Sequence, residues 1–212
     1  MRLILAISTF LAATGFAAAD TDVMTLLKSV EKRYNSAKTL RVDFAETYSL
    51  PGRGRSSESG QLSLRKPGKM LWTYAKPAGK VFVSDGKFVY YYSPDSNRAE
   101  KMKLKETEDM RAPLAFLLGK LEFDRDFKEY RSKPEGADTF ITAIPKSDKL
   151  PYSEVSFVVT PNGVIRRLIV TGQDKSILDF TFANESMNPS LSESLFTFVA
   201  PKGAEFVDST AQ

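Results

Sequence analysis

Acidic side chains at short spacing are the residues of this chain that come nearest to a catalytic pattern. Asp124 and Asp126 lie two positions apart, and Glu106, Glu108 and Asp109 form a second acidic run. Two carboxylates can hydrolyse a glycosidic bond when one acts as the acid and the other as base or nucleophile. Residues two apart on a strand also share one face, so a solvated polar face gives the same pattern, and that is the interpretation we adopt.

Other catalytic chemistry lacks its usual groups, because the chain has no histidine and no cysteine. Histidine is the common general base near neutral pH and the commonest zinc ligand, and it activates serine and cysteine nucleophiles. The phosphate-binding loop, the dinucleotide fingerprint and the G-x-S-x-G hydrolase motif are missing from the sequence as well. We therefore expect a protein that is not an enzyme and that holds no metal or cofactor.

Charge and length describe one domain of mild basic character. The 212 residues include 30 basic and 26 acidic side chains, a net charge of +4 that is spread evenly along the chain. Nucleic-acid binding requires a stronger and more clustered positive charge, so no nucleic-acid partner is expected. The sequence has no composition break that would mark a second domain.

The N-terminus has the three-part order of a secretory signal. Met1-Arg2 is a short positive start, residues 3–16 are apolar or small, and Ala17-Ala18-Ala19 precedes Asp20. We expect cleavage after residue 19, a single domain at residues 20–212 and export from the cytoplasm. A buried N-terminal helix is the alternative interpretation.

Two periodicities predict the elements that position the remaining side chains. Apolar residues at three- and four-residue spacing predict a helix over residues 22–37, and Pro113 followed by apolar residues predicts a second, short helix. Alternation with period two predicts about 11 strands, among them residues 121–130 and the hairpin around Asp85-Gly86. Strands in such number form a mainly β protein with one large antiparallel sheet, which must curl, split or close to bury its apolar face.

Several motifs follow one another in an order that resembles the LolA family of outer-membrane lipoprotein carriers. After the amphipathic helix come "GQLSLRKPGKMLWTY" and "VSDGKFVYYYSP", then the apolar helix at Pro113, "FVVTPNGVIRRLIV" and "FTFVAPKGAEFV". The first of these follows the family's G-x-L-x-hydrophobic-(K/R)-R-P core, which leads into a tryptophan, except that a lysine stands in the arginine position before the proline. The resemblance covers essentially the whole mature chain.

The resemblance implies a strongly curved, unclosed antiparallel β-barrel with helices lying over its concave opening as a lid. It also implies a function as a monomeric periplasmic carrier. Such a carrier takes acylated lipoproteins from an inner-membrane ABC-type release complex and delivers them to a LolB-like outer-membrane receptor. A sensor or scaffold that binds lipid or envelope proteins without transporting them is the alternative function.

The resemblance also assigns roles to residues of this chain. The lipid-binding face is expected to comprise Val42, Phe44, Leu62, Leu64, Met70, Trp72 and Tyr74. The lid is expected to comprise Leu26, Leu27 and Val30 of the first helix with Pro113, Leu114, Phe116 and Leu117 of the second.

Lys66 stands where the family commonly has an arginine that ties the lid shut. Lysine is a point charge and lacks the planar fork of arginine, so the lock in this chain is expected to be weaker or differently made. Arg65 precedes it and is expected to face the other side of the strand.

Arg53 and Arg55 lie in a predicted hairpin loop, which forms either a mobile tip or a docking contact for an acidic partner.

Overall fold

The computed structural model describes residues 17–104 and 121–210. The N-terminal half contains α1 (Ala17–Ser36), β1 (Thr39–Ser49), β2 (Arg55–Arg65), β3 (Lys69–Lys76), β4 (Val81–Asp85), β5 (Phe88–Ser93) and β6 (Arg98–Lys103). The C-terminal half contains α2 (Phe123–Asp126), β7 (Phe127–Glu135), β8 (Asp138–Pro145), β9 (Tyr152–Val159), β10 (Ile165–Gly172), β11 (Ile177–Met187), η3 (Glu193–Phe196) and β12 (Glu205–Asp208).

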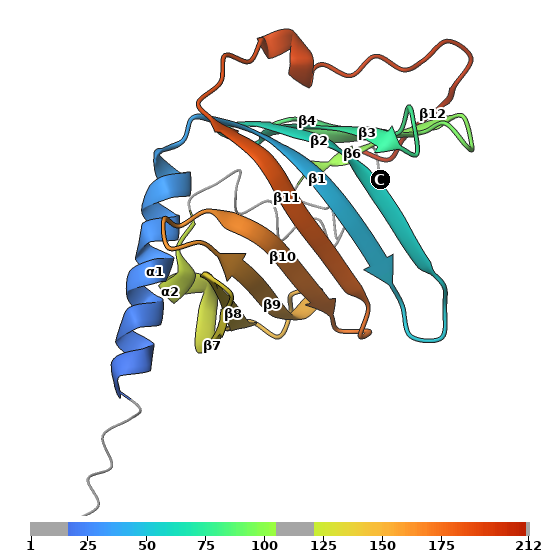
Figure 1. Ribbon diagram of the computed structural model, residues 1–212. Coiled ribbons are helices and arrows are strands. Elements are labelled where there is room, and N and C mark those ends of the chain that lie inside the picture. Colours follow the sequence, from blue (N-terminus) through green and yellow to red (C-terminus); the bar gives the residue numbers. More distant parts are fainter. Residues whose placement is uncertain (1–16, 105–120, 211–212) are drawn as a thin grey trace, which may run out of the picture.

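Within these residues, twelve strands form one sheet in the order β12-β6-β5-β4-β3-β2-β1-β11-β10-β9-β8-β7. The sheet is strongly curved and its two outermost strands, β12 and β7, do not pair with each other (Figure 1). The expected mainly β, curved and unclosed fold is confirmed, with twelve strands in place of about 11. Every neighbouring pair is antiparallel except β12 and β6, which are parallel.

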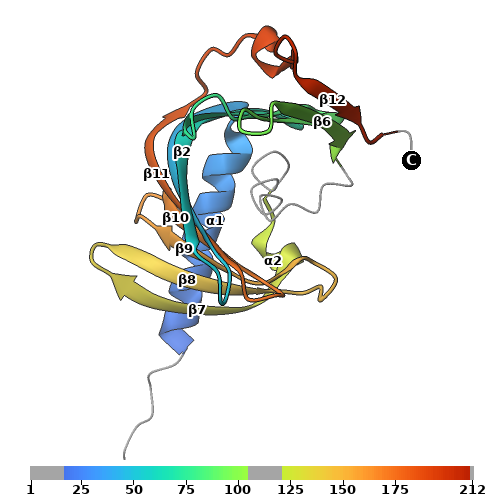
Figure 2. The same ribbon diagram turned by 90° about the vertical axis from the view of Figure 1, so that its right-hand side faces the viewer.

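Helix α1 lies on the inner, concave side of the sheet (Figure 2). Its buried positions, Val23, Leu27, Val30 and Tyr34, recur at the spacing of one helical face and join the core formed by the inner face of the sheet. The helix begins at Ala17, five residues before the expected start, so it spans the expected cleavage position between residues 19 and 20.

The hairpin between β4 and β5 forms as the sequence predicts. Gly86 has a φ of 98°, a conformation that glycine adopts without a steric cost. One carboxylate oxygen of Asp85 accepts hydrogen bonds from the backbone N–H groups of Lys87 and Phe88, both at 2.8 Å. These two residues therefore fix the turn and the register of the strands on either side.

The expectation of a strand over residues 121–130 is wrong at its start. Residues 123–126 form the short helix α2, and the strand β7 begins only at Phe127. Asp124 forms an ion pair with Lys28 of α1 at 2.7 Å, whereas Asp126 pairs with its neighbour Arg125. The two carboxylates are thus not neighbours on one strand face, and each has a cationic partner.

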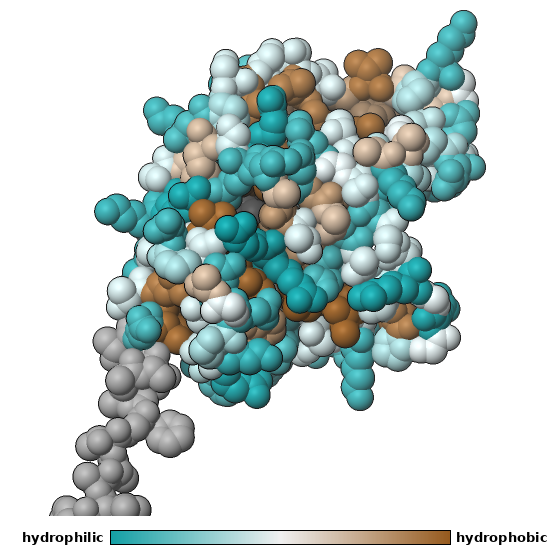
Figure 3. All heavy atoms as spheres, viewed as in Figure 1, coloured by the Kyte–Doolittle hydropathy of each residue, from teal (hydrophilic) through white to brown (hydrophobic). Residues whose placement is uncertain are grey.

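The C-terminal segment first crosses the outer side of the sheet, where η3 contacts β3 and β4, and then joins the sheet as β12 beside β6 (Figures 1 and 2). Ser192 caps η3 by accepting from the N–H of Ser194, and Phe198 stacks on Tyr90 of β5 at 5.3 Å. The segment also leaves apolar atoms in contact with water. Val199 is 80% exposed, and Figure 3 shows hydrophobic side chains at this upper edge of the molecule.

In residues 17–104 and 121–210, no helix is long and apolar enough to cross a membrane.

Candidate functional site

The inner face of the sheet carries a continuous row of apolar side chains. Residues that pair across neighbouring strands share one face, and the pairing places Val42, Leu62, Trp72 and Phe82 side by side across β1 to β4. All four side chains are buried, with Leu62 and Trp72 at 0% and 1% exposure. The alternation of the four strands therefore aims their largest apolar residues at the hollow of the sheet.

A second row lies nearer to α1 and a third lies farther from it. Leu64 pairs with Met70 on the helix side, and the indole N–H of Trp72 approaches the sulfur of Met70 at 3.4 Å. On the other side, Phe44 meets the rings of Trp72 and Tyr74 edge-on at 4.8 and 5.2 Å. The structure thus places all seven residues of the expected lipid-binding face together on the concave side.

Helix α1 covers one end of this face. Leu27 and Val30 are fully buried against the sheet, and Leu26 is partly buried and packs on the same core. These are the lid residues that the sequence analysis assigned to the first helix. The remaining lid assignments lie outside the described residues: Pro113, Leu114, Phe116 and Leu117.

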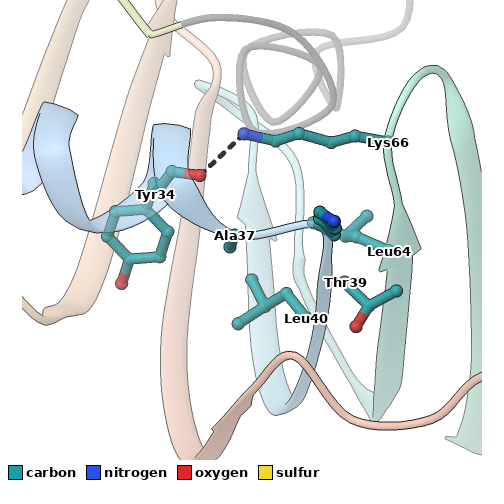
Figure 4. A pocket seen from close by; sticks show the side chains of 7 residues that line it. Tyr34, Ala37, Thr39, Leu40, Leu64 and Lys66 are labelled. Atoms are coloured by element: carbon teal, nitrogen blue, oxygen red, sulfur yellow. Dashed lines mark hydrogen bonds between the residues drawn. The ribbon is translucent and has the colours of Figure 1, made fainter.

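Lys66 contacts α1. Its ammonium donates a hydrogen bond of 2.6 Å to the backbone carbonyl of Tyr34 in the last turn of the helix (Figure 4). Burial lowers the pKa of Lys66, because the charged form loses part of its hydration. The adjacent Arg65 points to the other side, where it donates to the carbonyl of Leu191 at 2.8 Å. The two basic residues therefore hold different parts of the chain.

A small cavity lies beside this hydrogen bond (Figure 4). Its volume of about 10 Å³ is room for no more than roughly one water molecule, so no acyl chain fits between Lys66 and α1 in this conformation. The cavity is lined by Tyr34, Ala37, Lys38, Thr39, Leu40, Leu64 and Lys66.

Polar contacts hold α1 to the C-terminal half of the sheet. The buried hydroxyl of Tyr34 donates to Glu185 at 2.6 Å and accepts from the backbone N–H of Ile165 at 3.0 Å. Arg33 forms an ion pair with the same carboxylate. The side-chain amide of Asn35 makes two hydrogen bonds with the backbone of Leu121, at 2.7 and 2.8 Å. The C-terminal end of α1 is therefore bound at several points.

Sequence reasoning missed a group of charged residues on the inner face. Lys80 of the β3–β4 turn, Glu58 of β2 and Glu46 of β1 are largely buried among the apolar rows. The sequence analysis assigned no role to any of these three residues. The alternation of β1 was the available signal, because Glu46 continues the series Val42, Phe44 on the buried face.

These features define a class of protein. A curved, open sheet with an apolar inner face, covered at one end by an amphipathic helix, is an architecture for holding an apolar ligand. Among the described residues, no group of three or more acidic side chains is placed to bind a metal ion.

The chain belongs to the LolA family. The family model described as "Outer membrane lipoprotein carrier protein LolA" matches residues 35–199, which is most of the chain. The resemblance inferred from the motifs is thereby confirmed.

Individual relatives agree with this assignment. A protein of Nitrosomonas europaea named outer-membrane lipoprotein carrier protein is 26% identical over 182 residues, which cover 85% of this chain and 88% of that protein. A protein of Chromobacterium violaceum with the same name is 29% identical over 175 residues, 82% of each chain. Among solved structures, an uncharacterized conserved protein from Thermus thermophilus superposes with a TM-score of 0.53 at 13% identity. The match covers 88% of this chain and 98% of that protein's chain, and it supports the fold alone.

Proposed function

We propose that this protein carries acylated lipoproteins through the periplasm. It receives them from an ABC-type release complex of the inner membrane and delivers them to a LolB-like receptor of the outer membrane. Family membership and the names of its relatives support this function. The observation that carries it is the row Val42, Leu62, Trp72 and Phe82, an apolar surface on the concave side of an open sheet.

The contacts of α1 explain how such a carrier could release its cargo. Burying one acyl methylene stabilises a complex by about 0.8 kcal/mol, so three chains represent on the order of tens of kcal/mol. In the present structure, Leu27 and Val30 already occupy part of the inner face. Cargo that displaces them exchanges apolar protein contacts for apolar lipid contacts, and the net affinity stays low enough for transfer.

Lys66 is the proposed lock of the closed form. Its hydrogen bond to Tyr34 joins the β2–β3 turn to the end of α1, and a hydrogen bond to a charged group contributes about 1.5–3 kcal/mol. Opening the helix end away from the sheet breaks this contact, so the bond favours the empty state. The contact involves one carbonyl oxygen and a single ammonium, which suits a lock that opens in each transfer cycle.

Mass spectrometry of the lipids and proteins that co-purify from the periplasm of the native host tests the proposal. We expect triacylated lipoproteins bound at a one-to-one ratio, and their transfer to outer-membrane vesicles that contain the receptor. Free lipid without lipoprotein, or bound lipoprotein that never transfers, would instead identify a lipid sensor or scaffold. Absence of any acylated ligand would refute both functions.

A further inference from the structure

One charged pair lies within the apolar inner face. The ammonium of Lys80 is 2.6 Å from a carboxylate oxygen of Glu58, and Lys80 as a whole is only 8% exposed. The same ammonium lies over the ring of Tyr74, 4.4 Å from its centroid, and 5.7 Å from that of Tyr91. Lys80 therefore makes an ion pair and two cation–π contacts inside the hollow of the sheet.

The backbone sets this arrangement. Tyr74 donates its N–H to the carbonyl of Lys80, which places the lysine beside the end of β3. The pairing of β2 with β3 shifts between Ser59 and Gly60, and a Cβ at Gly60 would lie 2.0 Å from the carbonyl oxygen of Thr73. Glycine at this position lets the two strands approach, so that Lys80 reaches across β3 to Glu58.

A second carboxylate lies next to this pair. Glu46 is directly opposite Glu58 in the pairing of β1 with β2, and it is only 7% exposed. On β1 the preceding residues of the same face are Val42 and Phe44, both apolar and buried. The inner face thus changes from apolar to charged at one row, on the side farther from α1.

Charged side chains on the inner face cost free energy of folding, so a role in binding is a reason for their presence. A buried ion pair is often no more stable than apolar residues of the same volume, because both charges lose their hydration. The neighbouring rows show that the sheet can fill this face with apolar side chains. The ammonium of Lys80 donates to both oxygens of Glu58, which leaves one of its three donors, and the carboxylate of Glu58 keeps further acceptor sites for the polar groups of a ligand.

We propose that Lys80 and Glu58 form the subsite for the polar head of the lipidated cysteine of the cargo. This inference rests on the proposed carrier function and adds an orientation to it. The head carries two ester carbonyls and an amide carbonyl, one of which accepts from the remaining donor of the ammonium, and amide N–H groups, which donate to the carboxylate. The acyl chains then lie along Leu62 and Trp72 toward α1, and the polypeptide leaves past the β1–β2 hairpin.

The opposite end of the face does not suit the head. There Lys66 is bonded to Tyr34, and the cavity between them is no larger than one water molecule. A wider hollow of about 910 Å³ also touches Lys66, but it is open to solvent and extends to the outer side of the sheet, where Arg65 and Leu191 line it. Beyond Glu58, in contrast, Ser56 and Ser57 are exposed and polar. Polar groups of the cargo that pass this end remain hydrated, which avoids the cost of burying unpaired amides.

Binding measurements with two probes separate this subsite from a structural role. The double variant Lys80→Met/Glu58→Leu replaces both members of the pair by apolar residues, so that neither is left as a buried charge without the other. We expect its affinity for a synthetic triacylated cysteine lipopeptide to fall by about 10-fold or more, the range for lost hydrogen bonds to charged groups. Binding of the apolar dye N-phenyl-1-naphthylamine should be unchanged. The control is Arg167→Met/Asp179→Asn, which removes an ion pair of 2.7 Å from the outer face and should alter neither affinity.

Crosslinking tests the orientation directly. A lipopeptide with a benzophenone on the residue after the lipidated cysteine should label residues 46–58 or 77–80 of the wild-type protein, as read by mass spectrometry. Labelling at residues 34–39 or Lys66 would overturn the proposal, as would unchanged lipopeptide affinity or equal loss of both probes in the double variant. Wild-type protein that binds the dye and not the lipopeptide would refute the carrier function itself.

Discussion

The hydroxyl of Tyr34 lies 2.6 Å from a carboxylate oxygen of Glu185, a residue 151 positions later in the chain. The same hydroxyl accepts from the N–H of Ile165, so one side chain of α1 contacts both β11 and the start of β10. A lid made of α1 is consequently anchored near its C-terminal end. Lifting that end from the sheet breaks both of these hydrogen bonds and the one made by Lys66.

Tyr34→Phe should therefore destabilise the protein. The change leaves the N–H of Ile165 and one oxygen of Glu185 without the hydroxyl, and we expect a loss of about 1–3 kcal/mol in the free energy of unfolding. Tyr92→Phe is the matched control, because its hydroxyl makes an exposed contact of 3.2 Å with Asn97. Chemical denaturation of both variants measures the difference, and equal stability would contradict the anchoring role.

Alkaline pH should weaken the same anchor. Burial, followed by the nearby negative charge of Glu185, raises the pKa of Tyr34 above its ordinary value of 10.0. The unfolded chain loses its tyrosine proton first, so this contribution to stability is complete below pH 10.0 and falls as the pH rises above that value. Above about pH 10, wild-type protein should lose stability with rising pH more steeply than Tyr34→Phe does. If the free energy of unfolding depended on pH in the same way for both proteins, Tyr34 would ionise as readily in the folded state as in the unfolded state.

Met70→Glu should abolish cargo binding while the sheet stays folded. Met70 is 8% exposed on the inner face, and a carboxylate there costs several kcal/mol unless it is paired. Met70→Leu keeps the volume and should bind normally. Trp72→Glu should act in the same direction with a greater loss of stability, since Trp72 is 1% exposed and contacts two aromatic rings. Native circular dichroism with unchanged lipopeptide affinity in Met70→Glu would exclude this face as the binding surface.

Lys66→Leu should release cargo poorly. The variant lacks the hydrogen bond to Tyr34 that favours the closed, empty form, so the equilibrium moves toward the loaded form by about 1.5–3 kcal/mol. Lys66→Arg should transfer cargo at least as well as wild type, because its fork offers more donors to the same lock. Lys69→Leu serves as the control, since Lys69 pairs with Glu193 of the C-terminal segment. The readout is lipoprotein retained by each carrier after incubation with receptor. Wild-type release from Lys66→Leu would show that another contact closes α1.

The mature protein should begin at Asp20. Cleavage there removes the first three residues of α1 and leaves Val23, the first buried residue of the helix, in place. N-terminal analysis of protein recovered from the periplasm checks this. An intact Met1 would contradict both the signal and the proposed location.

Local patterns in the sequence predicted the elements well. The helix at residues 22–37 and the Asp85-Gly86 hairpin rest on spacing and turn chemistry within one element, and both are present. The strand proposed for residues 121–130 was wrong over residues 123–126, where Phe123 and Phe127 are four residues apart. That spacing fits alternation in a strand and one turn of a helix equally well.

Relationships between distant elements were not accessible from the sequence. The parallel pairing of β12 with β6 joins segments about a hundred residues apart, and no periodicity encodes a partner. The pair of Lys80 and Glu58 depends on the shift of register between Ser59 and Gly60. A slip of one residue in the pairing of these strands would turn Glu58 to the opposite face of the sheet. The burial of Tyr34 was predictable from its place on the helix stripe, whereas its contact with Glu185 was not.

The position of β1 next to β11 has a consequence for how the chain folds. Strands β1 to β6 and β7 to β11 are each consecutive neighbours, and only the pairing of β1 with β11, where Leu40 meets Met187, joins the two series in mid-sheet. On the proposed export route, with the N-terminus first, the chain cannot complete this seam until residue 187 has crossed the membrane. Until then β1 exposes a free edge of eleven residues, a template for wrong pairing. Closing so long a loop is slow, so the seam is the step at which newly exported chains depend most on protection from aggregation.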